Sequence, residues 1–196
     1  MRKERLEAFS DGVIAVIITI TVLEMKVPHG PELAALAPLI PVFLTYALSY
    51  TYVGIYWNNH HHMLQSTVSI NGAVMWANLH LLFWLSLLPF TTGWMGENHF
   101  ERWPTVLYGT NLLLCALAYS ILQHCLIRHH GRTSRLALAV AKDFKGKVSP
   151  VLYVAGILTA CTVSAWAGMS FFVVVALIWL VPDRRLERIV SASETE

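Results

Sequence analysis

Charged residues are scarce in this chain, and their scarcity sets its class. Only 13% of the 196 residues are Asp, Glu, Lys or Arg, whereas 56% are hydrophobic and the mean hydropathy is +0.54. Soluble domains carry about 25% charged residues. The composition therefore predicts an integral membrane protein, and the lack of alternating polar and apolar residues excludes a membrane β-barrel.

The chain also lacks the motifs of common enzymes. It contains no Gly-rich phosphate loop, no GxSxG motif, no HExxH motif and no polar segment long enough for a soluble catalytic domain. The three cysteines, Cys115, Cys125 and Cys161, follow neither a metal-site spacing nor a disulfide framework. We therefore expect no enzymatic activity, no bound cofactor or metal, and no nucleic-acid partner.

What the chain has instead is a series of long apolar stretches. An α-helix needs about 20 apolar residues to cross a bilayer. The last two stretches are shorter and only a few residues apart, which predicts a tight helical hairpin. We expect one all-α membrane domain over residues 1–196 with six transmembrane helices, near 5–25, 38–63, 70–95, 104–127, 149–164 and 168–182.

The basic residues are distributed unevenly around these stretches. Of the 14 Lys and Arg residues, only Lys26 and Arg102 lie in the odd-numbered connections. Because cytoplasmic loops carry the excess of Lys and Arg, we predict a multi-pass plasma-membrane protein with both termini in the cytoplasm. The basic connection 128–148 is interpreted as an ordinary cytoplasmic loop. The alternative is a short amphipathic helix over Leu136–Phe144 at the membrane surface, in contact with lipid.

A few polar side chains interrupt the first three stretches. Asp11 lies near the start of the first, three histidines end the second, and Asn78 and His80 lie in the third. Because successive helices alternate in direction, these groups share the cytoplasmic half of the membrane, where an unpaired carboxylate is costly. We expect Asp11 to find a hydrogen-bond partner among His60, His61 and Asn78.

Two interpretations of this polar group stay open. The simpler one is a structural network that fixes helix packing. The other is a site that handles protons or a metal ion, since histidine titrates near neutrality and neutral imidazoles bind metals. Consecutive residues on a helix are about 100° apart, so His60, His61 and His62 are not expected to bind one metal together.

The first stretch carries a separate apolar stripe. Val16, Thr19, Ile20 and Leu23 follow the i, i+3, i+4, i+7 spacing and share one helix face. Asp11 lies roughly 140° away from Val16 around the helix, so the carboxylate and the stripe face different neighbours. Spacing alone favours lipid contact or helix packing for the stripe.

Residues 5–24, RLEAFSDGVIAVIITITVLE, closely resemble the signature of the transmembrane protein 175 family of potassium channels. The matching positions are Arg5, Phe9, Ser10 and Asp11. The resemblance continues through Trp57, Asn59, His60 and His61, then Asn78 to Phe90, and finally Pro182 to Arg188. His80 stands where the pattern has an aliphatic residue.

The resemblance implies a homotetramer of six-helix subunits around a central pore lined by the first helix. Its constriction would consist of Val16, Ile20 and Leu23, with Thr19 as a hydroxyl ring beside them, and the permeant ion would be K⁺. Val16 replaces a larger residue at the innermost layer, which predicts a wider ring. The resemblance assigns a structural polar network to Arg5, Phe9, Ser10, Asp11, Trp57, Asn59, His60, His61 and Asn78.

Two other functions compete with a passive potassium-preferring channel. A proton-coupled transporter would use Asp11 with His60 and His61 as a relay. A membrane-embedded metalloenzyme is the weaker alternative and predicts stoichiometric zinc or iron in the purified protein.

Overall fold

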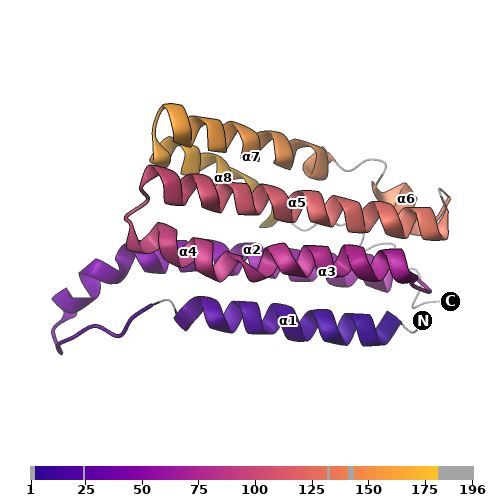
Figure 1. Cartoon of the computed structure of the whole chain (residues 1–196), viewed down its shortest axis with the longest axis horizontal. Coiled ribbons are helices and arrows are strands. Elements are labelled where there is room, and N and C mark those ends of the chain that lie inside the picture. The colour runs from indigo at the N-terminus through magenta and orange to yellow at the C-terminus, as the bar shows by residue number, and fades with distance from the viewer. Residues whose placement is uncertain (1–2, 24, 132, 141–143, 181–196) are drawn as a thin grey trace.

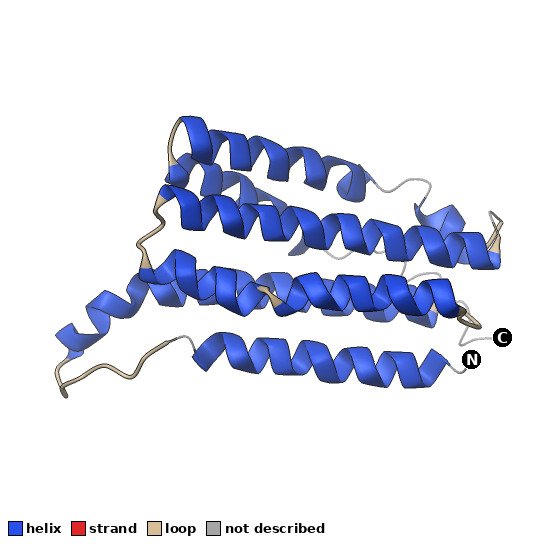
Figure 2. Cartoon of the chain, viewed as in Figure 1, coloured by secondary structure: helices blue, strands red, loops and turns tan. Residues whose placement is uncertain are grey.

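The computed structural model describes residues 3–23, 25–131, 133–140 and 144–180, and every regular element in these ranges is helical (Figures 1 and 2). The long helices lie side by side, with α1 along one edge of the bundle and α7 along the opposite edge. The elements are α1 (Lys3–Leu23), the 3₁₀ helix η1 (Leu33–Leu39), α2 (Ile40–Gln65), α3 (Gly72–Ser86), α4 (Leu88–Glu97), α5 (Arg102–His130), α6 (Arg135–Val140), α7 (Phe144–Thr162) and α8 (Ala165–Leu180).

Four segments are long and apolar enough to cross a membrane. They are Lys3–Leu23, Leu33–Gln65, Gly72–Glu97 and Arg102–His130, while Ala165–Leu180 is a shorter apolar helix. These segments coincide with the first four predicted stretches. The predicted hairpin corresponds to α7 and α8, which are joined by Val163 and Ser164, and residues 181–182 of its last stretch lie outside the described residues.

The prediction of a single third helix is wrong, because the structure has two consecutive helices in this segment. The sequence predicted one helix over 70–95, whereas α3 ends at Ser86 and α4 begins at Leu88. Pro89 explains the break, since its ring nitrogen donates no hydrogen bond and proline disfavours helical backbone at the preceding residue. The two helices still form one apolar segment.

The basic connection contains a helix that is shorter than the alternative prediction. The observed α6 spans Arg135–Val140, and residues 141–143 lie outside the described ranges. Helix α7 then begins at Phe144, five residues before the predicted start near 149.

Small residues bring α7 and α8 together. A Cβ atom placed on Gly168 would lie 2.6 Å from the carbonyl oxygen of Gly156 and 2.5 Å from the Cβ of Ala160. Only glycine permits this approach, and close backbone contact through small residues is typical of helix packing in membranes. The hairpin in turn packs on α5 and completes the side of the bundle away from α1 (Figure 1).

Candidate pore helix and its anchor

Helix α1 has one face packed in the bundle and another that is open in the single chain. The packed residues repeat at spacings of four, four, three and four, and are Leu6, Ser10, Ile14, Ile17 and Thr21. On the open face, the exposed fractions are 53% for Val16, 43% for Ile20 and 76% for Leu23, and Thr19 is also exposed. The four stripe residues therefore share an unpacked face of the subunit, as their helical spacing requires.

The packed face of α1 is anchored by a buried chain of hydrogen bonds. The side-chain amide of Asn78 on α3 donates to Ser10 Oγ at 2.9 Å, and Asn78 Oδ1 lies 2.7 Å from Nε2 of His60 on α2. All three side chains are at most 1% exposed. One side chain of α3 thus links α1 to α2.

The hydrogen bonds between these three side chains also determine which atom of each one donates a proton and which accepts. Ser10 donates its own hydroxyl proton to the Leu6 carbonyl at 2.8 Å. Its oxygen must therefore accept from the Asn78 amide, so that Asn78 Oδ1 faces His60 and His60 Nε2 carries the proton that it donates. Each member has one defined role, which is the arrangement expected of a structural network in an apolar bundle.

The predicted partners of Asp11 are wrong. Instead of His60, His61 or Asn78, its Oδ1 accepts a hydrogen bond from Trp57 Nε1 at 3.0 Å. The reason is geometric: Asp11 lies about 100° from Ser10 around α1, so Ser10 points to Asn78 and Asp11 points to α2. The Trp57 ring stacks on His61 with centroids 5.9 Å apart, which places His61 behind the indole.

Other members of the predicted network lie apart from it. Phe9 is 53% exposed, and it shares a groove beside α1 with Pro89 and Phe90 of α4. Arg5 is exposed, and its side chain forms no hydrogen bond or ion pair with any described residue. The Asn59 side chain donates to the carbonyl of Ile55, one turn back.

The remaining histidines of interest take no part in the anchor. His80 is exposed and accepts a hydrogen bond from Trp84 Nε1 at 2.9 Å on its own helix. His62 lies against His61, with ring centroids 5.7 Å apart. Within the described part of the chain, no group of three or more His, Cys, Asp or Glu residues is arranged to hold a metal ion.

A second buried polar cluster was missed by the sequence reasoning. Ser49 on α2 lies 2.6 Å from Thr92 Oγ1 on α4 and 3.1 Å from the Tyr108 hydroxyl on α5. Hydroxyl residues are common in apolar helices because they bond their own backbone, so their sequence positions carried little signal. This cluster joins α2, α4 and α5 near the opposite end of the bundle.

The fold and the two-faced first helix define a multi-pass helical membrane protein. A family model described as "Endosomal/lysosomal potassium channel TMEM175" matches residues 5–89. A protein of Chryseobacterium sp. (strain P1-3) named a potassium channel is 52% identical over 188 residues, which cover 96% of this chain and 97% of that protein. The chain belongs to the TMEM175 family.

Two more distant relatives are named as channels for different ions. The crystal structure of a lysosomal potassium-selective channel TMEM175 homologue from Chamaesiphon minutus matches with a TM-score of 0.80 at 26% identity, and it covers 91% of this chain and 96% of that one. The human protein named endosomal/lysosomal proton channel TMEM175 is 32% identical over 116 residues, which cover 53% of this chain and 23% of the human protein.

Proposed function

We propose that this protein is a potassium-preferring cation channel of the plasma membrane. Four copies would surround a central pore lined by α1, with six membrane crossings per subunit and both termini in the cytoplasm. The observation that carries the proposal is the open face of α1, where an apolar stripe with one hydroxyl is left unpacked while the opposite face is anchored. The potassium-channel names of the bacterial relatives support the choice of ion.

The constriction would be formed by Val16, Ile20 and Leu23. A helix rises 1.5 Å per residue, so these side chains line about 10 Å of the pore. Narrow apolar rings exclude ions by dewetting, and conduction requires the helices to move apart. The smaller Val16 would give the widest of the three rings, which places the main barrier at Ile20 and Leu23.

Thr19 supplies the polar group of the same face. Its hydroxyl donates to the Val16 carbonyl at 2.9 Å, which uses the proton and leaves oxygen lone pairs for a cation. Four such oxygens would replace part of the hydration shell of a passing ion. K⁺ gives up water more readily than the smaller Na⁺, so partial dehydration favours K⁺.

A liposome flux assay with K⁺ and Na⁺ gradients in turn tests this proposal. Leu23→Ala should raise flux or reduce the K⁺ preference, because it removes the most exposed apolar layer. Val22→Ala is the matched control, since Val22 is also exposed, at 39%, but lies about 100° from Leu23 around the helix. Unchanged flux and ion ratio in Leu23→Ala would remove α1 from the pore.

Proton permeation is the second candidate, and the names of the vertebrate relatives favour it. The relay that the sequence suggested has a weak geometric basis, because Asp11 is bonded to Trp57 whereas His60 is bonded to Asn78. The same liposomes loaded with a pH-sensitive dye separate the candidates. Acidification without K⁺ flux would replace the potassium proposal.

A further inference from the structure

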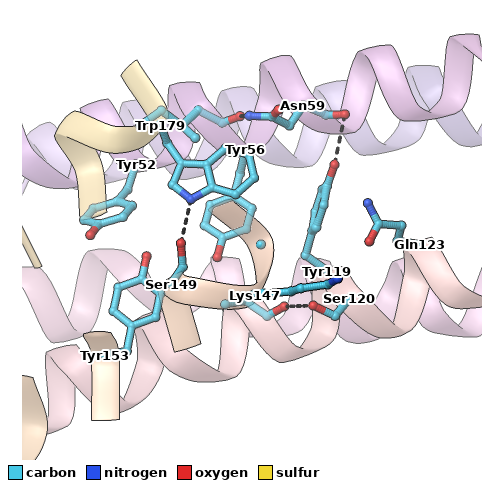
Figure 3. A pocket seen from close by; sticks show the side chains of 13 residues that line it. Tyr52, Tyr56, Asn59, Tyr119, Ser120, Gln123, Lys147, Ser149, Tyr153 and Trp179 are labelled. Carbon is cyan, nitrogen blue, oxygen red and sulfur yellow. Dashed lines mark hydrogen bonds between the residues drawn. The ribbon is translucent and has the colours of Figure 1, made fainter. Parts of the chain in front are cut away.

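A cavity of about 170 Å³ lies between α2, α5, α7 and α8, and no residue of α1 lines it. It is therefore separate from the proposed pore face. Figure 3 shows aromatic rings from all four helices turned toward it. The aromatic residues are Tyr52, Tyr56, Tyr119, Tyr153 and Trp179.

The charge in the lining of the cavity is positive. Lys147 is the single charged residue in its lining, and no carboxylate lines it within the described part of the chain. Lys145, one turn from Ser149, places its ammonium 5.9 Å from the centre of the Trp179 ring. An aromatic cage can bind an organic cation, but the Lys147 ammonium in the lining favours an anion instead.

Polar groups are concentrated near Lys147. Ser120 and Gln123 on α5 lie on that side of the cavity (Figure 3). Trp179 donates to Ser149 Oγ at 2.8 Å, and Tyr119 donates to the Asn59 carbonyl at 3.3 Å. These bonds hold the aromatic wall in place, so the cavity combines a fixed apolar wall with a cationic, hydrogen-bonding mouth.

The cavity extends from the middle of the bundle, where Tyr52, Ala116 and Tyr153 line it, toward the end at which α7 begins and α8 ends. Its lining includes residues from the first three turns of α7 and from the last turn of α8. With both termini in the cytoplasm, as proposed above, the Lys147 end of the cavity is the one directed toward the inner membrane–water interface. Basic pockets between transmembrane helices on that side are recognised binding places for anionic lipid headgroups.

We propose that this cavity binds an anionic phospholipid of the inner leaflet. The lipid phosphate would contact Lys147 and the side-chain amide of Gln123, and the apolar part next to the headgroup would lie against the tyrosines. The proposal rests on the proposed orientation but not on potassium conduction, so failure of the flux assay leaves it intact.

The test is lipid retention by the purified protein, measured by native mass spectrometry after exposure to phosphatidylglycerol or phosphatidylcholine. We expect one retained phosphatidylglycerol per chain. Lys147→Gln should lower its affinity about fivefold, since one lysine near the membrane surface contributes ~1 kcal/mol, and Lys147→Arg should retain it. Arg128→Gln is the matched control, because Arg128 is an exposed basic residue near the end of α5 that does not line this cavity.

A second variant tests the cavity itself. Ala116 lines it, so Ala116→Phe should fill the space and abolish retention without changing the charge. Thermal melting and gel filtration identify variants that fail to fold. Equal binding of both lipids, an equal loss in Arg128→Gln, or full retention in Ala116→Phe would each overturn the proposal. Displacement of the lipid by millimolar inorganic phosphate would assign the mouth to free phosphate instead.

Discussion

Replacing Asn78 by alanine tests the anchor of α1 most directly. Asn78 is fully buried and contacts Ser10 on α1 and His60 on α2. Interhelical hydrogen bonds in membrane proteins contribute ~0.6 kcal/mol on average and up to ~1.7 kcal/mol. The variant loses two of them and also leaves the His60 Nε2 proton without an acceptor, which costs a further ~1–3 kcal/mol. We therefore expect destabilisation of about 2–4 kcal/mol.

The matched control lies two residues away on the same helix. His80 is exposed and, among the described residues, its side chain forms a hydrogen bond only with Trp84 one turn along α3, so His80→Ala should change stability by less than about 0.5 kcal/mol. The free energy of unfolding is measured by reversible denaturation in mixed micelles, and the thermal midpoint gives an independent ranking. Equal stability of the two variants would show that the buried chain of hydrogen bonds does not hold α1 in place.

Two further substitutions address other contacts. Asp11→Ala should lower the free energy of unfolding by about 1 kcal/mol, because it removes an interhelical acceptor. Asp11→Asn keeps an acceptor oxygen, so its thermal midpoint should lie within a few degrees of that of the original protein. A lower thermal midpoint for Asp11→Asn than for Asp11→Ala would refute the contact. Gly168→Val should lower stability by about 1–3 kcal/mol, because its Cβ meets Gly156 and Ala160 across the hairpin. Ala167→Val is its control, and equal thermal midpoints would show that α7 and α8 do not require the close approach.

The sequence predicted the helices well and the side-chain partners less well. Apolar length located the long segments because a bilayer imposes that length on any helix that crosses it. The break between Ser86 and Leu88 was missed, although Pro89 was visible, since transmembrane helices often accommodate proline. A hydropathy pattern does not report such a local interruption.

Residue spacing predicted the two faces of α1, yet it misassigned Asp11. Spacing on a single helix gives the direction of a side chain relative to its neighbours, but the partner depends on how the second helix is rotated. The rotation of α2 brings Trp57 to the carboxylate and His60 to Asn78. The aromatic cavity was invisible for the same reason, because its walls come from four helices spread between Tyr52 and Trp179.

The polar contacts of α1 are unevenly distributed along its length. Its side-chain hydrogen bonds to other described helices come from Lys3, Ser10 and Asp11. Beyond Asp11, the hydroxyls of Thr19 and Thr21 bond the backbone of α1 itself. Apolar contacts tolerate sliding, whereas hydrogen bonds require fixed geometry. If α1 lines a pore, its first half is therefore the fixed part and its second half, which carries Val16 to Leu23, is the part able to move apart and wet the constriction.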